Sequence, residues 1–327
     1  MTRLAIADQG IPMTSPESTS DGKWSTGRVR LAWFLLSLYA VLLLGDIAYA
    51  IRADRGIVAL ESTWTFDADG VRADCLARTT GEGETALLLV HGFNDSPRTW
   101  DRMTPELVAR GYLCRAMRLP GFAERHAQYG RPTTDEWLAE IRREIDRLRE
   151  AGHRVVLVGH SLGGALSLRT ALDVGDRLEG VVLVAPAIDV SETRSPLLPI
   201  RVWQRIAESI LVFVPATASP FGVETKDPDD EPYPYRTPFT PRRVIAQTIG
   251  LIDRNAADSD KLDVPLMVAV VPDDVVVDPV ATERWYERVE APRKVRFEAN
   301  RSAHPLPRDL DAPDLCRAID EFVRSLE

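Results

Sequence analysis

The longest apolar stretch of the sequence lies near the start of the chain. Residues 31–45 contain no charged side chain, and the apolar run then continues past a single acidic residue, Asp46. As a helix with a rise of about 1.5 Å per residue, residues 31–51 would be about 31 Å long, which matches the hydrocarbon core of a bilayer. The pattern therefore predicts a transmembrane anchor or signal segment over residues 31–52, preceded by a disordered polar tail over residues 1–30.

Two features of this segment bear on where the rest of the chain lies. Basic residues precede the segment, and under the positive-inside rule they place the N-terminus in the cytoplasm and everything after residue 52 on the extracytoplasmic side. The tripeptide Ala48-Tyr49-Ala50 instead fits the cleavage site of a signal peptide, whose removal would release a secreted or periplasmic protein. We expect an uncleaved anchor that binds the membrane through residues 31–51. Cleavage near Ala50 and a buried helix of the folded part are the alternatives.

From about residue 58 onward, short apolar runs alternate with helical patterns. Each run has the length and composition of a strand that is buried on both faces of a parallel sheet. The strands are predicted at residues 86–90, 112–118, 154–158, 181–185, 264–271 and 294–298, and the helices at residues 100–110 and 133–151. An Asp69-Gly70 turn between residues 63–68 and 71–77 predicts a β-hairpin ahead of them. The alternation predicts an α/β fold, with a mostly parallel sheet and helices on both faces.

Composition and charge narrow the classes of function. The chain has 327 residues with 45% hydrophobic and 27% charged side chains, which is ordinary globular usage. Its formal net charge of −9 leaves no basic face for a phosphate backbone, so we expect no nucleic-acid partner. The three cysteines, Cys75, Cys114 and Cys316, are far apart and form no cluster at metal-ligand spacing, so we expect no metal site.

The strongest chemical motif follows the predicted strand at residues 154–158. Residues 159–163 are Gly-His-Ser-Leu-Gly, a G-x-S-x-G sequence at the junction between a strand and a helix. Such a nucleophile elbow holds its serine in a strained backbone conformation, and glycines flank it where a Cβ would clash. We therefore expect Ser161 to be a nucleophile at the carboxyl edge of the sheet, next to the positive end of a helix.

A nucleophilic serine needs a base and an acid, and the chain order of serine, acid and histidine restricts both. Of the five histidines, His304 alone lies near the C-terminus, in a loop after the last predicted strand. The acid is expected after the preceding strand, where Asp273, Asp274 and Asp278 lie. A buried carboxylate there would fix the tautomer of the imidazole and stabilise the imidazolium. We assign this role to Asp274, with Asp278 and then Asp273 as the alternatives.

The oxyanion formed when a serine attacks a carbonyl group needs hydrogen-bond donors. Two backbone N–H groups are suitably placed, that of Phe93 in the turn after the strand at residues 86–90 and that of Leu162 next to the nucleophile. We expect both amides to form an oxyanion hole. His91, in the same turn, is expected to order the loop through hydrogen bonds and not to transfer protons.

These motifs, taken in order, resemble the α/β-hydrolase superfamily. The resemblance rests on His-Gly-Phe-Asn-Asp-Ser-Pro at residues 91–97, Arg-Leu-Pro-Gly at residues 118–121, Trp137, and Gly-His-Ser-Leu-Gly-Gly at residues 159–164. The resemblance covers about residues 60–327. Within the superfamily, the chain is similar to the serine aminopeptidase-like group, which contains bacterial carboxylesterases, monoacylglycerol lipases and lysophospholipases. The family's acid and histidine loops match Asp274 and His304.

The resemblance also implies a division of the chain. An α/β-hydrolase core is expected over residues 58–185 and 264–327, interrupted by a cap insertion over residues 186–263. Ten prolines between residues 186 and 241 are expected to prevent long regular elements there. An apolar stripe in the cap is interpreted as a core-facing helix face, or else as a lining for an acyl chain or a face on the membrane. It consists of Ile200, Trp203, Ile206, Ile210 and Phe213.

The activity that the resemblance implies is hydrolysis of carboxylic esters without a metal or organic cofactor. We expect lipid-like acyl esters, such as monoacylglycerols or lysophospholipids, to be cleaved through an acyl-enzyme on Ser161. A thioesterase or exopeptidase of the same fold, or a non-catalytic binding module, are the alternatives. The fold also places Cys75 and Cys114 on neighbouring strands, where they could form a disulfide after export.

Overall fold

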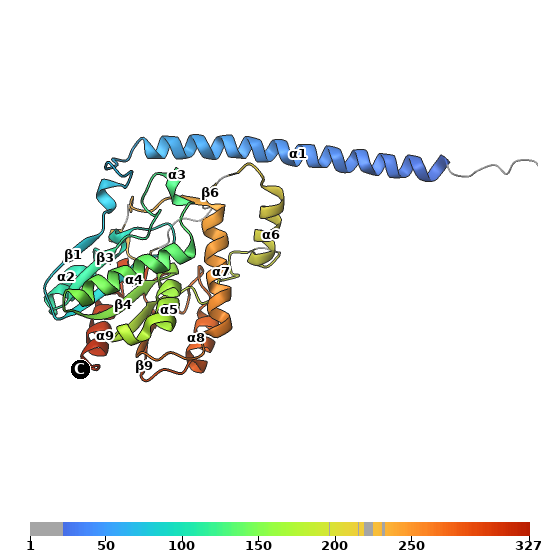
Figure 1. Ribbon diagram of the computed structural model, residues 1–327. Coiled ribbons are helices and arrows are strands. Elements are labelled where there is room, and N and C mark those ends of the chain that lie inside the picture. The colour runs from blue at the N-terminus through green and yellow to red at the C-terminus, as the bar shows by residue number, and fades with distance from the viewer. Residues whose placement is uncertain (1–21, 196, 215, 219–224, 231–232) are drawn as a thin grey trace, which may run out of the picture. The chain divides into compact units, whose positions relative to one another are not determined.

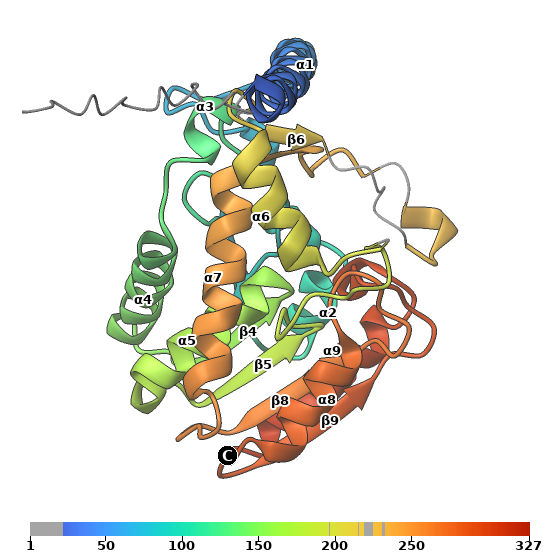
Figure 2. The same ribbon diagram turned by 90° about the vertical axis from the view of Figure 1, so that its right-hand side faces the viewer.

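A mostly parallel sheet forms the centre of the fold, as the alternation of strands and helices predicted. The computed structural model describes residues 22–195, 197–214, 216–218, 225–230 and 233–327. The main sheet has seven strands in the order β1-β3-β2-β4-β5-β8-β9, and only β1 runs antiparallel to its neighbour. Its strands are β1 (Arg78–Thr80), β2 (Thr85–Val90), β3 (Leu113–Met117), β4 (Arg154–His160), β5 (Gly180–Val184), β8 (Leu266–Val270) and β9 (Lys294–Glu298). Figure 2 shows β4, β5, β8 and β9 side by side.

Helices cover both faces of this sheet. One face carries α4 (Thr134–Glu150), α5 (Leu162–Val174), α7 (Arg242–Asp258) and α8 (Pro279–Arg288). The other face carries α2 (Thr104–Ala109) and α9 (Ala312–Arg324). Figure 1 shows this layering, which buries β2, β5 and β8 completely. The shorter helical turns are η1 (Ala73–Cys75), η2 (Pro97–Trp100), α3 (His126–Tyr129), η3 (Gly175–Arg177) and η5 (Leu306–Arg308).

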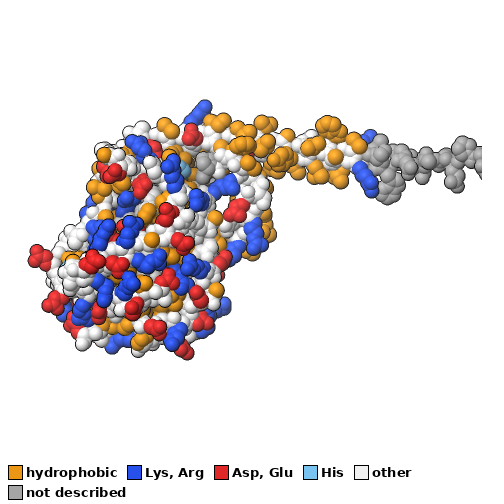
Figure 3. All heavy atoms as spheres, viewed as in Figure 1, with side chains coloured by type: hydrophobic (Ala, Val, Ile, Leu, Met, Phe, Trp, Pro, Cys, Tyr) orange, Lys and Arg blue, Asp and Glu red, His pale blue; other side chains and the backbone are white. Residues whose placement is uncertain are grey.

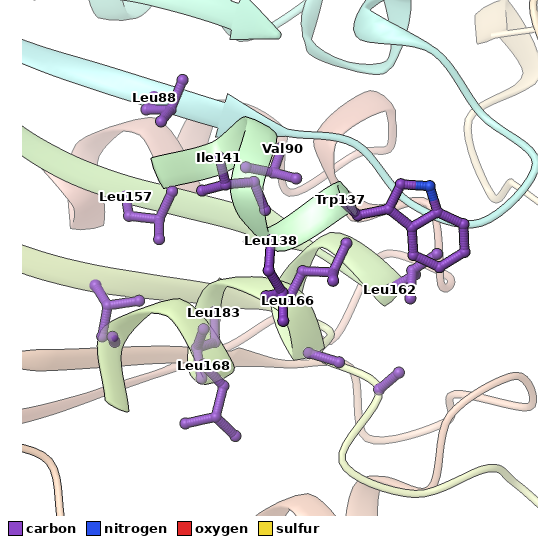
Figure 4. Close-up of a cluster of buried hydrophobic side chains, with 14 of the residues drawn as sticks. Leu88, Val90, Trp137, Leu138, Ile141, Leu157, Leu162, Leu166, Leu168 and Leu183 are labelled. Carbon is purple, nitrogen blue, oxygen red and sulfur yellow. The ribbon is translucent and has the colours of Figure 1, made fainter. Parts of the chain in front are cut away.

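The hydrophobic core consists of two clusters, one on each face of the sheet. Along β2, Leu88 and Val90 join the cluster beneath α4 and α5, whereas Leu87 and Leu89 join the cluster beneath α2 and α9. Figure 4 shows the first cluster, in which Trp137 and other side chains of α4 and α5 lie against the sheet. Because side chains alternate along a strand, a continuous apolar run fills both clusters at once.

Helix α4 shows how local sequence sets the bounds of an element. Thr133 accepts a hydrogen bond from the Glu136 amide, and the Glu136 carboxylate accepts one from the Thr133 amide. This capping box satisfies two amides that the helix itself leaves free. The buried face includes Trp137, Ile141 and Ile145, so the predicted helix over residues 133–151 is confirmed nearly to the residue.

The β-hairpin predicted over residues 63–77 is wrong. A turn is present at Gly70, whose φ is 79°, but Phe66 and Arg72 form only an isolated bridge. The Asp67 carboxylate accepts a hydrogen bond from the Val71 amide and closes the turn locally. The Ala73 amide still donates to the Thr65 carbonyl, but η1 begins at Ala73 and ends the pairing, and the Arg72 amide donates to the carbonyl of Ala123. This segment is therefore held by the loop at residue 123.

The helix predicted over residues 100–110 is shorter in the structure. Helix α2 begins at Thr104, after the turn η2, and Pro105 occupies its first turn. Proline is tolerated at that position because the first amides of a helix have no intrahelical acceptor.

The N-terminal helix α1 (Gly22–Glu61) is longer than the predicted membrane segment. It begins inside the stretch that was predicted to be a disordered tail over residues 1–30, of which residues 1–21 lie outside the described residues. Apolar side chains between residues 31 and 44 are mostly exposed, and Figure 3 shows them along the helix. Within the described part of the chain, this is the one helix long and apolar enough to cross a membrane.

The C-terminal part of α1 belongs to the same compact unit as the sheet, which comprises residues 46–327. Ala53 and Ile57 are buried on this unit. At Gly56 the ring of Phe239 comes so near that an added Cβ would lie 2.7 Å from it. These contacts are those of a core element and not of a free linker.

Polar contacts join the same part of α1 to the segment between β5 and β8. The Asp46 carboxylate accepts hydrogen bonds from the backbone amides of Val212 and Phe213, at 2.7 and 2.8 Å. The Tyr49 hydroxyl accepts one from the Ala218 amide at 3.1 Å. Asp46 is buried, so the one charge of the apolar run is held by two backbone donors.

The predicted cap segment, residues 186–263, departs from the strand–helix alternation. It contains α6 (Ile200–Ile210), η4 (Pro228–Asp230), α7, and a small antiparallel sheet of β6 (Ala216–Ala218) and β7 (Phe239–Pro241). Pro199 and Pro241 directly precede α6 and α7. A proline before the first turn removes no helical hydrogen bond, whereas one inside the helix would. These prolines therefore mark where the two helices begin.

The apolar stripe of the cap does not face the core. No residue of α6 is buried, and Trp203, Ile210 and Phe213 are exposed. The core-facing interpretation of the stripe is therefore wrong.

The three cysteines are buried free thiols, so the disulfide that Cys75 and Cys114 could have formed is not present. Cys75 lies in η1 and not on a strand. Burial raises the pKa of Cys75 to about 11 and that of Cys114 to about 12, so both thiols stay protonated near neutral pH.

Candidate active site

Ser161 lies at the turn between β4 and α5, in a backbone conformation that L-residues rarely adopt. Its φ is 55° and its ψ is −116°. A Cβ on Gly159 would lie 2.2 Å from the Gly163 carbonyl oxygen, and a Cβ on Gly163 would lie 2.4 Å from that of Val90. Only glycine fits at both positions, which explains the spacing of the motif. The sharp turn has the form expected of a nucleophile elbow.

The structure brings together the three residues that the sequence analysis selected. The Ser161 Oγ lies 2.9 Å from Nε2 of His304, and Nδ1 of the same ring lies 2.7 Å from Oδ2 of Asp274. Asp274 lies in the turn after β8, and His304 lies in the loop after β9. The segments that follow the carboxyl ends of β4, β8 and β9 thus meet at one point.

The surroundings of Asp274 keep its carboxylate ionised. Burial raises the pKa of Asp274, but His304 and hydrogen bonds from the amides of Val276 and Val277 lower it by more, so the net pKa is below the ordinary value. An ionised Asp274 accepts a hydrogen bond from Nδ1–H of His304. Nε2 of that ring is then free to accept the proton of Ser161.

The two alternative acids lie elsewhere. The Asp278 carboxylate caps α8 by accepting hydrogen bonds from the amides of Val280 and Ala281. Asp273 is exposed at the edge of the pocket that contains Ser161. Among the three aspartates, only Asp274 contacts His304.

The turn after β2 lies against the nucleophile. A Cβ on Gly92 would lie 3.2 Å from the Cβ of Ser161, and Phe93 lines the same pocket. Among the described residues, neither the Phe93 amide nor the Leu162 amide donates a hydrogen bond to the protein. Two unpartnered N–H groups beside a serine hydroxyl are what an oxyanion hole requires.

His91 orders this turn, as the sequence analysis expected. Its Nε2 accepts a hydrogen bond from the Leu119 amide at 3.2 Å, and its Nδ1 donates to the Gly92 carbonyl at 3.0 Å. Complete burial lowers the pKa of His91 to about 4, so the ring is neutral near neutral pH. A neutral ring with both nitrogens bonded holds the loop but transfers no proton.

The loop of His304 is held by residues that were not predicted from the sequence. His160, which precedes the nucleophile, donates from Nε2 to the His304 carbonyl oxygen at 2.9 Å. Asp309 accepts a hydrogen bond from the Ala303 amide at 2.7 Å, and Asp311 accepts one from the Ser302 hydroxyl at 3.0 Å. The only sequence signal for these contacts was the presence of two aspartates shortly after His304.

A protein family and several known proteins are similar to this chain. The family model described as serine aminopeptidase, S33, matches residues 81–311. A thermostable monoacylglycerol lipase of Bacillus sp. (strain H-257) is 24% identical over 240 residues, which are 73% of this chain and 90% of that protein.

Solved structures have the same fold. The monoacylglycerol lipase of Paleococcus ferrophilus is 21% identical, with a TM-score of 0.66 over 77% of this chain and 98% of that one. A monoglyceride lipase from Saccharomyces cerevisiae is 15% identical, with a TM-score of 0.66 over 76% and 91% of the two chains. The fold is that of the α/β-hydrolases, and the chain belongs to the serine aminopeptidase S33 family.

Proposed function

We propose that the protein is a serine hydrolase that cleaves carboxylic esters through an acyl-enzyme on Ser161. The observation that supports this most is the continuous hydrogen-bonded series from Ser161 through His304 to the buried Asp274. In the first step, Nε2 of His304 takes the proton of Ser161 while Oγ attacks the acyl carbonyl carbon. The oxyanion of the tetrahedral intermediate is bound by the amides of Phe93 and Leu162.

The two half-reactions use the same groups. His304 donates its proton to the oxygen of the departing alcohol, which leaves an ester between Ser161 and the acyl group. His304 then takes a proton from a water molecule that attacks this ester, and the carboxylic acid departs as Ser161 is reprotonated. Asp274 holds the imidazole in the Nδ1–H tautomer and stabilises the imidazolium between these steps. The mechanism needs no metal or organic cofactor.

The substrates that we propose are lipid-like acyl esters of the monoacylglycerol or lysophospholipid type. The printed activity of the Bacillus relative supports the acylglycerol class. Residues 186–263 act as a cap over the pocket, since Arg194, Lys226 and Arg236 of this segment line it together with Ser161. The strained backbone of Ser161 favours an enzyme over a non-catalytic binding module, because strain at a serine that lines a pocket is of use mainly to a nucleophile.

We further propose that α1 stays attached as a membrane anchor, with the catalytic unit on the extracytoplasmic side. The contacts of Asp46 and Tyr49 with the cap segment support this, because cleavage after Ala50 would remove both side chains. Intact mass analysis of the purified protein tests the proposal. Retention of residues 1–50 in a carbonate-resistant membrane fraction is expected, and a mature N-terminus near residue 51 would contradict it.

The experiment that tests the enzyme is labelling by a fluorophosphonate together with turnover of p-nitrophenyl butyrate. Wild-type protein is expected to label and to turn over, and Ser161→Ala to do neither while it keeps its circular dichroism. Ser167→Ala, at a buried serine of the same helix, is the matched control and is expected to label normally. Turnover by Ser161→Ala would refute the assignment. Thioester and aminoacyl substrates in the same assay separate the thioesterase and exopeptidase alternatives.

A further inference from the structure

The pocket around Ser161 is lined by cationic side chains, although the whole chain is acidic. Arg194, Lys226 and Arg236 lie around it together with Ser161 and His304. The lining of the pocket also includes two carboxylates, those of Asp95 and Asp273. A neutral ester carries no charge of its own for these cations to pair with, so their presence calls for a physical explanation.

The backbone at Arg236 is held in place by contacts of the neighbouring residues. Nearby, the hydroxyl of Tyr233 donates to Oδ1 of Asp95 at 2.7 Å. The Thr237 amide donates to the Asn94 carbonyl at 3.0 Å. Arg236 therefore lies between two points at which the cap segment is attached to the turn after β2. Its position in the pocket follows from these attachments and not from a flexible loop.

A third attachment lies directly beside it. Arg98 donates to the Tyr235 hydroxyl at 2.8 Å, and its guanidinium lies 4.2 Å from the centre of that ring. Because both ends of the short segment and its middle are fixed, the backbone at Arg236 has a defined place at the pocket that Ser161 also lines.

Among the described residues, Arg236 forms no hydrogen bond and no ion pair, although the charge of Asp95 acts on it. Its nearest carboxylate, Asp95, already accepts hydrogen bonds from Tyr233 and from the Ser96 amide. Burial lowers the pKa of Arg236, and the charge of Asp95 does not restore it. A desolvated guanidinium without a partner gains most from an anionic ligand.

Lys226, from an earlier part of the cap segment, lines the same pocket. Its backbone amide donates to Oδ2 of Asp309 at 3.0 Å, and Asp309 also holds the loop of His304. Its side chain is exposed, so the ammonium group can approach a ligand from the solvent side. Asp273, which lines the same pocket, is exposed as well and is screened by water.

We propose that Arg236, assisted by Lys226, binds an anionic group of the ester substrate beside Ser161. The group is a phosphate on the alcohol part or a carboxylate at the far end of the acyl part. A carboxylate and a phosphate each present two oxygens that a guanidinium binds through two N–H donors. This inference rests on the proposed esterase function and names its substrate class.

The test compares matched pairs of esters on the full-length protein in neutral detergent. On the alcohol side the pair is 1-octanoylglycerol and 1-octanoylglycerol 3-phosphate, and on the acyl side it is p-nitrophenyl pentanoate and mono-p-nitrophenyl glutarate. We expect kcat/KM for the anionic member of at least one pair to exceed that of its neutral partner about tenfold to a hundredfold. The pair that shows the preference identifies the source of the anion.

Variants then assign the preference to its residues. Arg236→Met is expected to lower the ratio of anionic to neutral kcat/KM to near one, mainly through KM, and Arg236→Lys to restore part of it. Arg293→Met removes an exposed charge at the start of β9, at the opposite end of the sheet, and is expected to leave the ratio unchanged. The preference of the wild type should also fall as salt is added. A neutral preference in both pairs, or a ratio that Arg236→Met does not change, would overturn the proposal.

Binding separates this inference from the function on which it rests. In Ser161→Ala protein, which lacks the nucleophile, calorimetry is expected to show tighter binding of 1-octanoylglycerol 3-phosphate or mono-p-nitrophenyl glutarate than of its neutral partner. That preference is expected even if no ester were turned over by the wild type. Equal affinities within both pairs would overturn the subsite and leave the esterase proposal standing.

Discussion

The imidazole of His160 donates a hydrogen bond to the backbone carbonyl oxygen of His304, 2.9 Å away. The two rings lie with their centres 5.1 Å apart. The residue before the nucleophile therefore holds the main chain of the proposed base. Burial and the neighbouring His304 lower the pKa of His160 to about 3, so it stays neutral and keeps this bond across the working pH range.

His160→Ala is expected to lower kcat/KM for a neutral ester about tenfold or more, because a buried carbonyl loses its donor and His304 loses its fixed position. His160→Gln retains an N–H donor and is expected to recover part of the loss. His153→Ala, just before β4 and remote from the pocket, serves as the control. Equal losses in the Ala and Gln variants would show that His160 does not act through this bond.

Asp274→Asn is expected to lower kcat by about four orders of magnitude, because an amide cannot hold the Nδ1–H tautomer or stabilise the imidazolium. Asp278→Asn is the matched control at the alternative acid. Asparagine caps a helix about as well as aspartate, so this variant is expected to keep its activity and its melting temperature. The opposite result, with Asp278→Asn inactive, would transfer the acid role.

Stability is expected to fall as the pH drops from about 6.5 towards 4. The pKa of His91 is about 4 in the folded protein, against about 6.5 in an unfolded chain, so between these values the unfolded state binds a proton that the folded state does not. This pKa difference makes the free energy of unfolding rise with pH, by up to about 1.4 kcal/mol per pH unit for each such histidine. His160 adds to the same effect.

Urea unfolding at pH 7.5, 6 and 5 measures this slope. His91→Gln keeps an uncharged polar group in place of the ring and is expected to show a smaller loss of stability between pH 6.5 and 5 than the wild type. Equal slopes in the two proteins would mean that His91 is not buried as a neutral group.

Asp46→Ala is expected to loosen the cap segment, since the amides of Val212 and Phe213 would lose their acceptor. Hydrogen exchange over residues 211–214 measures the change, and exchange there is expected to become about tenfold faster or more. Asp54→Asn, at an exposed position of the same helix, is the control and should leave that exchange unchanged. Unaltered exchange in Asp46→Ala would show that these bonds do not hold the cap.

The parts of this protein that could be predicted from sequence are those with a local physical cause. The apolar runs predicted the strands. The glycines at positions 159 and 163 predicted the elbow, because a side chain at either position would collide with the main chain. Chain order then restricted the choice to Asp274 and His304. Each of these inferences depends on a few neighbouring residues.

The features that were missed depend on contacts between distant segments. The bond from His160 to His304 spans 144 positions, and Arg236 reaches the pocket only because the turn after β2 holds its neighbours. The hairpin predicted at residues 63–77 is reduced to one bridge, because η1 begins at Ala73 and residues 71 and 72 pair with residues 123 and 124. No pattern within a short window carries this information.

The backbone of Ser161 represents a trade between stability and reactivity. A serine at φ 55° and ψ −116° costs on the order of 1–3 kcal/mol, a substantial share of the 5–15 kcal/mol that separates a folded domain from its unfolded chain. The surrounding sheet must therefore be more stable than the function alone would require. The complete burial of β2, β5 and β8 supplies stability that offsets the strain at that one residue.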